Sequence, residues 1–407
     1  MISVDEARAL VLDQSRPLAQ VETPLAAALD GILAVDARSD VDSPPHDKSV
    51  VDGYALRAAD LSDGRGELAI LEEVTAGQMP THSVTVNACT RIMTGAPIPA
   101  GADAVVMIER TELLADDRVR IDDPRCVAGQ NIMPQASSLR QGEVVVHRGT
   151  RLRPIDIGLL AETGHAHVRV FDRPRVAMLA TGNELVAIDQ QPGPGKIRNS
   201  NSHLLASLLA QAQARPAPLG IARDDRSALR EAIERGLDCD ALLLSGGVSA
   251  GVLDLVPAVL AELGVQAVFH KVRVKPGKPL WFGVHERAAH RCLVFGLPGN
   301  PLSGLVNFEL FVRPALRTMQ GETDVTPAYE RARLGQEFRQ RGTRQTYYPA
   351  TLRRQAMSST ITPVEWRGSA DLRGFAAANA LAMFPAGERR FDEGEEIDVL
   401  PLQDVRG

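Results

Sequence analysis

The sequence lacks paired cysteines, a basic excess and long apolar stretches, and each absence excludes a class of protein. Its four cysteines stand far apart along 407 residues, which argues against a disulfide framework and a cysteine-ligated zinc site. Lys plus Arg number 45 and Asp plus Glu 51, so no basic surface for nucleic acid is expected. No apolar stretch has spanning length, and the first residues lack a signal-peptide pattern. We therefore expect a soluble, cytoplasmic protein that binds neither nucleic acid nor membrane.

Familiar nucleotide and nucleophile motifs are also missing. No Gly-x-x-x-x-Gly-Lys-Ser/Thr sequence is present, which excludes a Walker loop, and no Gly-x-Gly-x-x-Gly opens a helix. Ser245 has no Gly-x-Ser-x-Gly frame, so it is interpreted as an anion ligand rather than a nucleophile.

The sequence pattern predicts several domains that differ in their secondary structure. A capping box formed by Ser3 and Glu6 predicts a helix over about the first seventeen residues, and Thr23-Pro24 predicts a second short helix that ends at Gly31. Residues 36–149 alternate short β-type runs with turns. Buried strands then alternate with amphipathic helices, and strand-like segments return after residue 321. This is an α/β multidomain chain with a central, doubly wound, mostly parallel sheet.

The predicted central sheet places four loops at one edge. They follow successive strands, at residues 181–184, 223–225, 245–249 and 297–301. Ligands bind outside the carboxyl ends of strands in such sheets. In the 245–249 loop, Gly246 and Gly247 allow successive backbone N–H groups to face one anion, with the hydroxyls of Ser245 and Ser249 beside them.

Cations and carboxylates accompany these loops. Lys275 and Lys278 lie in a stiff Lys-Pro-Gly-Lys-Pro turn, which suits a phosphate or another oxyanion. Carboxylates are supplied at four positions: Asp52, Glu184, Asp224 and Asp254. Because Mg²⁺ is usually held by one or two carboxylates plus phosphate oxygens, this mixture favours a magnesium-assisted reaction at a phosphate.

Six ordered motifs then resemble those of one family. They are Ser-Val-Val-Asp-Gly-Tyr-Ala at 49–55, Thr-Gly-Ala-Pro-Ile-Pro-Ala-Gly-Ala-Asp-Ala-Val-Val at 94–106, Thr-Gly-Asn-Glu-Leu at 181–185, Ser-Gly-Gly-Val-Ser at 245–249, Lys-Pro-Gly-Lys-Pro at 275–279 and Gly-Leu-Pro-Gly-Asn-Pro at 296–301. Together they resemble the molybdopterin molybdenumtransferases, the MoeA and gephyrin E-domain family.

The resemblance implies a homodimer of elongated four-domain subunits. Residues 1–22, 41–50 and 133–172 would form a discontinuous dimerisation and linking domain, and residues 23–40 and 51–132 a β-rich domain. Residues 173–321 would form the molybdopterin-binding α/β domain, and residues 322–407 a C-terminal β-barrel. The active site would lie between the α/β domain of one subunit and the β-rich domain of the other.

The resemblance also assigns site residues. The catalytic set that it implies is Asp52, Thr94, Glu184, Asp224, Asp254, Lys275 and Lys278. Substrate and anion ligands would be Ser245, Gly246, Gly247, Ser249, Pro298, Gly299, Asn300, Pro301, Arg344 and Ser369. Glu184 and Asp254 would hold Mg²⁺.

The family reaction takes adenylylated molybdopterin and molybdate, cleaves the phosphoanhydride, releases AMP and leaves molybdenum on the dithiolene. Expected partners are these small molecules, other proteins of molybdenum-cofactor biosynthesis and recipient apo-enzymes.

Four stretches depart from the family pattern. Asn183 stands where Asp is usual, Ala-Ser-Ser at 136–138 replaces Gly-Glu-Asp, uncharged residues 250–253 precede Asp254, and Pro349 replaces Arg, with Arg344 nearby.

Two alternatives stay open: a non-catalytic dimeric scaffold of the gephyrin E-domain kind, and a related molybdopterin adenylyltransferase. The motifs at 49–55 and 94–106 argue against the second.

Overall fold

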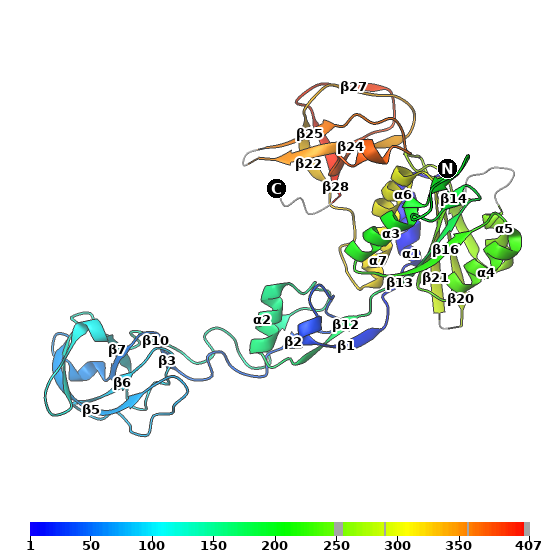
Figure 1. Cartoon of the computed structure of the whole chain (residues 1–407). Helices are drawn as coiled ribbons and strands as arrows, with labels where there is room; N and C mark the ends of the chain where they lie inside the picture. The colour runs from blue at the N-terminus through cyan, green and yellow to red at the C-terminus, as the bar shows by residue number, and fades with distance from the viewer. Residues whose placement is uncertain (248–254, 289, 356–357, 403–407) are drawn as a thin grey trace.

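The computed structural model of the chain describes residues 1–247, 255–288, 290–355 and 358–402. These residues form an elongated molecule with a β-rich domain at one end, a linking part in the middle, and an α/β domain with a C-terminal barrel at the other end (Figure 1). We call residues 15–172 the arm, and residues 1–14 with 173–402 the body. All four cysteines are free thiols. In the described part of the chain, no helix has the length and apolarity needed to cross a bilayer.

Helix α1 (Val4–Gln14) begins the chain and packs on the body. The predicted capping box is confirmed: the Glu6 N–H donates to the Ser3 hydroxyl, and the Ser3 N–H donates to the Glu6 carboxylate. The buried side of α1, formed by Val4, Ala7 and Val11, joins the core beneath the α/β sheet.

The predicted second helix is wrong. Residues 20–24 form strand β1 (Gln20–Pro24), which pairs antiparallel with β12 (His167–Phe171), and a single 3-10 turn η1 (Leu25–Ala27) follows. The pairing partner lies far along the chain, so local capping signals around Thr23 could not indicate it.

The linking part contains these two strands and a second short pair. Strand β2 (Ala37–Arg38) pairs with β11 (Val144–Val146), and helix α2 (Pro154–Glu162) packs nearby. Residues 23–24 and 37–38 belong to the range 23–40 that was expected with the β-rich domain, but they pair with β12 and β11 in the middle of the molecule.

The β-rich domain is built on a six-stranded sheet. In sheet order its strands are β7 (Ala104–Met107), β4 (Gly53–Leu56), β6 (Ala88–Ile92), β5 (Arg65–Val74), β9 (Arg118–Asp122) and β8 (Thr111–Leu113). Strand β3 (Lys48–Ser49) pairs with β10 (Ile132–Met133) where the chain enters and leaves the domain.

The α/β domain has a six-stranded mixed sheet. In order its strands are β16 (Arg215–Ala222), β13 (Arg175–Thr181), β17 (Ala241–Ser245), β21 (His290–Leu297), β20 (Trp281–Arg287) and β18 (Gln266–His270). The first four are parallel, and β20 and β18 run antiparallel to their neighbours. The sequence patterns predicted all of these strands except β20.

Helices cover both faces of this sheet, as predicted for a doubly wound domain. Alternate residues of β13 enter two separate cores, with Val176 and Met178 in one and Ala177 and Leu179 in the other. The first core takes α1, α3 (Ser200–Gln211), α6 (Pro301–Asn307), a π-helical segment (Phe308–Val312) and α7 (Arg313–Met319). The second takes α4 (Arg226–Gly236) and α5 (Val256–Glu262).

The C-terminal domain is a closed five-stranded barrel, as expected. Its strands, in order around the barrel, are β24 (Gln345–Arg354), β25 (Ser359–Pro363), β22 (Glu330–Leu334), β28 (Glu396–Pro401) and β26 (Ala380–Phe384), which pairs back with β24. A hairpin-like pair, β23 (Phe338–Gln340) and β27 (Arg389–Phe391), and a short helix α8 (Leu372–Phe375) complete it. Strand β19 (Val274–Lys275) leaves the α/β domain to pair with β24.

Candidate functional site

The four predicted loops meet at one edge of the central sheet. In the strand register, Thr181 lies opposite Ala222, Ala180 opposite Ser245, and Ser245 opposite Leu297. The loops that follow β13, β16, β17 and β21 therefore begin side by side, because parallel strands end at the same edge.

Two adjoining cavities lie at this edge. They have volumes of about 590 and about 550 Å³, and both are bordered by Thr181, Glu184, Gly246, Gly247 and Gly299. The larger one also touches Pro298, Asn300 and Pro301, and the smaller one touches Asp224. Of the seventeen residues expected in the site, eight line the larger cavity: Glu184, Ser245, Gly246, Gly247, Pro298, Gly299, Asn300 and Pro301.

The glycines after β17 have backbones that only glycine adopts easily. Their φ values are +96° at Gly246 and +64° at Gly247, and a Cβ on Gly246 would lie 2.5 Å from the Thr181 carbonyl oxygen. The expectation that both amides face an anion is corrected for Gly246, whose N–H donates to the Leu297 carbonyl at 3.1 Å. The Gly247 N–H has no partner among the described residues and stays available.

Asn201, on the first turn of α3, is a site residue that sequence reasoning missed. Its Nδ2 donates to the Ser245 hydroxyl at 2.9 Å and to the Gly299 carbonyl at 2.7 Å, which ties two of the loops together. Its Oδ1 is buried and accepts no hydrogen bond from the described residues. Only the fold joins positions so distant in sequence, so no local signal marks Asn201.

The carboxylates of this edge are exposed. Glu184 folds back over Gly182, and its carboxylate has no hydrogen-bond or ion-pair partner among the residues that the structure describes. Asp224 and Asn183 bind each other twice: the Asn183 N–H donates to the Asp224 carboxylate, and the Asp224 N–H donates to Asn183 Oδ1, both at 3.2 Å. An aspartate at position 183 would place a second negative charge against Asp224, which asparagine avoids.

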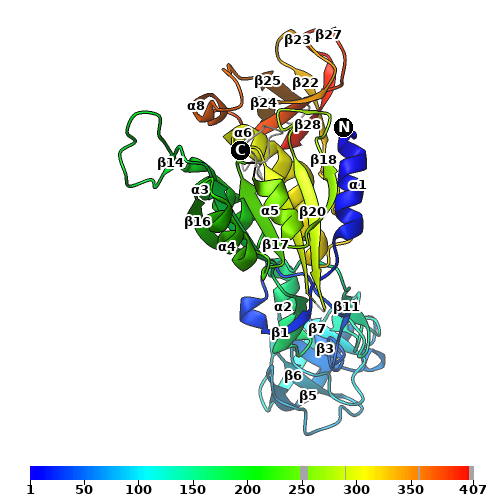
Figure 2. The same ribbon diagram turned by 90° about the vertical axis from the view of Figure 1, so that its right-hand side faces the viewer.

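The segment after Glu184 projects away from the sheet between β14 (Leu185–Val186) and β15 (Ile197–Arg198) (Figure 2). Lys196 Nζ donates to the Asn183 carbonyl at 2.6 Å, and Arg198 lines the larger cavity. Neither residue belonged to a motif that predicts chemistry, and both reach the site because this segment folds back on it.

The lysine turn is held against α6. Asn307 Nδ2 donates to the Gly277 carbonyl at 3.1 Å, and the following Pro279 lines the larger cavity. Lys275 is half-buried and Lys278 exposed, and within the described ranges neither ammonium group forms an ion pair. The cations of this turn are therefore free to pair with a ligand.

The barrel closes the same edge from the other side. Asn300 Nδ2 donates to the Ser369 hydroxyl at 2.9 Å, so Ser369 joins the site through the loop after β21. Arg344 instead donates to the Val274 carbonyl at 3.1 Å, behind the lysine turn. Pro349, on β24, is buried in the barrel wall.

Asp52 and Thr94 contact each other in the β-rich domain, where Asp52 precedes β4 and Thr94 follows β6. This domain lies at the opposite end of the molecule from the α/β domain (Figure 1). The Thr94 N–H and hydroxyl both donate to Asp52 Oδ1 at 2.7 Å. The backbone N–H, and then the hydroxyl, hold the pKa of Asp52 below its usual value. Within one chain these two residues do not reach the other members of the expected site.

Two expected residues, Ser249 and Asp254, lie outside the described residues. Within the described part of the chain, no group of three or more His, Cys, Asp or Glu side chains is placed to hold a metal ion. A metal at this edge would therefore depend on ligand oxygens as well as on Glu184.

Comparison with known proteins covers nearly the whole chain. Three family models match in order: "MoeA N-terminal region (domain I and II)" at residues 2–164, "Probable molybdopterin binding domain" at 177–318, and "MoeA C-terminal region (domain IV)" at 331–402.

Individual relatives agree with these matches. The molybdopterin molybdenumtransferase of Staphylococcus epidermidis is 33% identical over 98% of this chain and 95% of its own length. That of Nostoc is 34% identical over 92% of this chain and 87% of its own length. Among solved structures, the molybdopterin biosynthesis MoeA protein of Pyrococcus horikosii superposes with a TM-score of 0.86 at 30% identity, covering 99% of both chains.

Proposed function

Because the chain belongs to the molybdopterin molybdenumtransferase (MoeA) family, we propose that it inserts molybdate into adenylylated molybdopterin, cleaves the phosphoanhydride and releases AMP. The observation that carries this proposal is the sheet edge itself, where two adjoining cavities are bordered by loops from four neighbouring strands. Such an edge is where doubly wound sheets bind ligands that carry phosphate groups.

In this proposal, the anions of the substrates are bound by groups that have no partner among the described residues. The Gly247 N–H and the ammonium groups of Lys275 and Lys278 have none among the described residues, so binding an anion there breaks no internal contact. Ser245 and Ser369 add hydroxyls on opposite sides of the loop after β21. Pyrophosphate and molybdate are both oxyanions and take the same kinds of donor.

The residues at this edge fit Mg²⁺ bound jointly with substrate. Mg²⁺ prefers oxygen ligands and commonly takes one or two carboxylates plus phosphate oxygens. The carboxylate of Glu184, which has no partner among the described residues, would supply one such ligand, and Asp254 is the second residue that we assign to it. A bound ion would neutralise charge on the phosphates, and Glu184 and Asp224 would orient the water at the phosphoanhydride.

The site is completed by a second copy of the chain. Asp52 and Thr94 form a preorganised pair, yet their β-rich domain lies at the opposite end of the molecule from the α/β domain that holds the cavities (Figure 1). In a two-fold dimer each arm can deliver its pair to the cavity of the partner, so that two equivalent sites form.

A complementation experiment tests this arrangement. The Asp52→Ala variant has a defective arm, and the Glu184→Gln variant has a defective cavity, so each alone should lose molybdate-dependent AMP release. After unfolding and refolding an equal mixture, random pairing makes half of the dimers mixed, each with one intact site. The mixture should then regain about a quarter of wild-type activity.

The control mixes Asp52→Ala with a second arm variant, Thr94→Ala. Every subunit in that mixture has a defective arm, so no intact site can form and activity should stay at the level of the single variants. Absence of recovery in the first mixture, with dimers demonstrated, would show that the site is not shared.

A further inference from the structure

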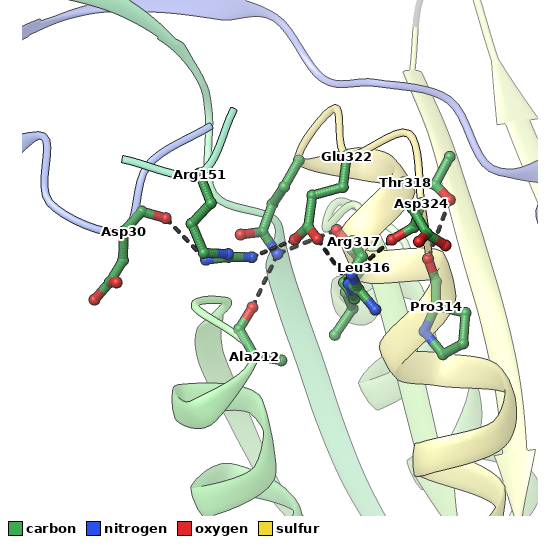
Figure 3. A network of polar contacts seen from close by, with 10 residues as sticks. Asp30, Arg151, Ala212, Pro314, Leu316, Arg317, Thr318, Glu322 and Asp324 are labelled. Atoms are coloured by element: carbon green, nitrogen blue, oxygen red, sulfur yellow. Dashed lines mark hydrogen bonds and ion pairs between the residues drawn. The ribbon is translucent and has the colours of Figure 1, made fainter. Parts of the chain in front are cut away.

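The arm and the body meet at an ion-pair cluster built around one largely buried carboxylate. Glu322, just after α7, lies between Arg151 of the arm and Arg317 of the body (Figure 3). Arg317 Nε donates to its carboxylate at 2.7 Å, and Arg151 binds the other carboxylate oxygen. The Glu322 side chain is only 10% exposed. We call these three residues the junction cluster.

Both arginines are themselves fixed by backbone carbonyls. Arg151 donates to the Asp30 carbonyl at 2.9 Å within the arm, and Arg317 donates to the Asp324 carbonyl at 2.6 Å within the body. Each guanidinium is therefore held in its own part of the molecule, and Glu322 joins the two. Leaving a carboxylate this buried without a partner would cost free energy. The hydrogen bonds from the two guanidinium groups are directional, so they fix the position of the carboxylate.

Other contacts join arm and body here as well: the Leu18 N–H donates to the Met319 carbonyl at 2.8 Å, and the Phe171 ring lies against Gly321. Among the described residues, one further ion pair joins arm to body, between Asp172 and the largely exposed Arg215. A cavity of about 740 Å³, bordered by Arg151, Arg317, Glu322 and barrel residues, separates the arm from the barrel.

We propose that Glu322 is a positioning residue for the transferase reaction, because it fixes the angle at which the arm leaves the body. This rests on the shared site proposed above. The β-rich domain that carries Asp52 forms the far end of the arm, so a small rotation at Glu322 becomes a larger displacement of this domain (Figure 1). Misplacing a group that acts on the reaction lowers the rate more than it lowers substrate affinity.

The test compares two junction variants with a matched control, all as full-length dimers. Arg151→Ala removes the arm's half of the cluster and leaves Glu322 paired with Arg317, so the body stays intact. Glu322→Gln removes the shared charge without changing side-chain size. Glu330→Gln breaks an ion pair with Arg354 that borders the same cavity but lies entirely within the body.

Small-angle X-ray scattering should show a broader distribution of long interatomic distances for both junction variants than for the wild-type protein. The distribution for Glu330→Gln should equal that of the wild type. With adenylylated molybdopterin and molybdate, kcat should fall about ten- to a hundredfold, while KM for molybdate changes about twofold or less. Glu330→Gln should keep both values.

Unchanged scattering for both junction variants would overturn the assignment of Glu322 to the arm angle. Changed scattering with unchanged kcat would overturn its role in the reaction, provided that Asp52→Ala abolishes turnover in the same assay. If Asp52→Ala also leaves turnover intact, the shared site itself is wrong, and the role of Glu322 falls with it.

Discussion

Glu72 illustrates how a single carboxylate fixes a loop of the β-rich domain. It lies on β5 and accepts hydrogen bonds from the Thr81 N–H at 3.0 Å, the Thr81 hydroxyl at 2.6 Å and the His82 N–H at 2.8 Å. Burial raises the pKa of Glu72, but these hydrogen bonds outweigh burial and lower it to about 2. The carboxylate therefore stays ionised while it holds the loop.

Glu72→Gln should lower the free energy of unfolding of the β-rich domain at pH 7 by about 1–3 kcal/mol, because hydrogen bonds to an ionised acceptor become neutral ones. The folded pKa of about 2 lies below the ordinary value of 4.5, so the stabilisation is present above pH 4.5 and is lost as the pH falls toward 2. Urea unfolding at several pH values measures this difference.

The neighbouring Glu73 offers the control for this prediction. It pairs with Arg91 at 3.2 Å, but its side chain is 49% exposed, so Glu73→Gln should change stability little at any pH. A stability gap between wild type and Glu72→Gln that persisted unchanged at pH 2 would contradict the explanation.

At the scale of elements, the sequence predicts best what is determined locally. The capping box of Ser3 and Glu6 predicted the start of α1, and both of its hydrogen bonds are present. Buried apolar runs predicted most strands of the central sheet, and hence the edge where the loops meet. Strands β20 and β1 were not predicted, and the helix expected from Thr23 to Gly31 is a single 3-10 turn, because pairing with distant segments decided these stretches.

The same distinction holds for the candidate site. Gly246, Gly247 and the loop after β21 stand out in the sequence because turns need special residues. Asn201 does not, since its partner Gly299 lies 98 positions away. That the Gly246 N–H is occupied by Leu297 also depends on register between two strands, which composition does not reveal.

Gly246→Ala should reduce kcat/KM at least about tenfold, since a Cβ there would lie 2.5 Å from the Thr181 carbonyl and displace the loop after β17. Steady-state AMP release measures this effect. Gly264→Ala is the matched control, because Gly264 has a similar φ of +80° but open space around its Cβ position. It should lose about 1 kcal/mol of stability and keep its activity; equal losses of activity in both variants would contradict the steric explanation.

At the scale of the whole molecule, the proposed sharing of the site between two subunits would link activity to association. Diluting the protein below the dissociation constant of its dimer should lower specific activity roughly in proportion to the remaining dimer. Analytical ultracentrifugation and initial rates over one concentration series test this. Full specific activity in samples shown to be monomeric would contradict a site formed by two subunits.

The pairing of β19 with β24 has a consequence for how this chain can be altered. The strand that carries Lys275 is hydrogen-bonded into the wall of the C-terminal barrel, with Lys275 opposite Thr346. Exchanging the barrel for one from a relative would therefore relocate a positive charge at the sheet edge, even though no residue of the central domain had been changed. In chimeric proteins, residues 272–279 and strand β24 should therefore come from the same parent protein.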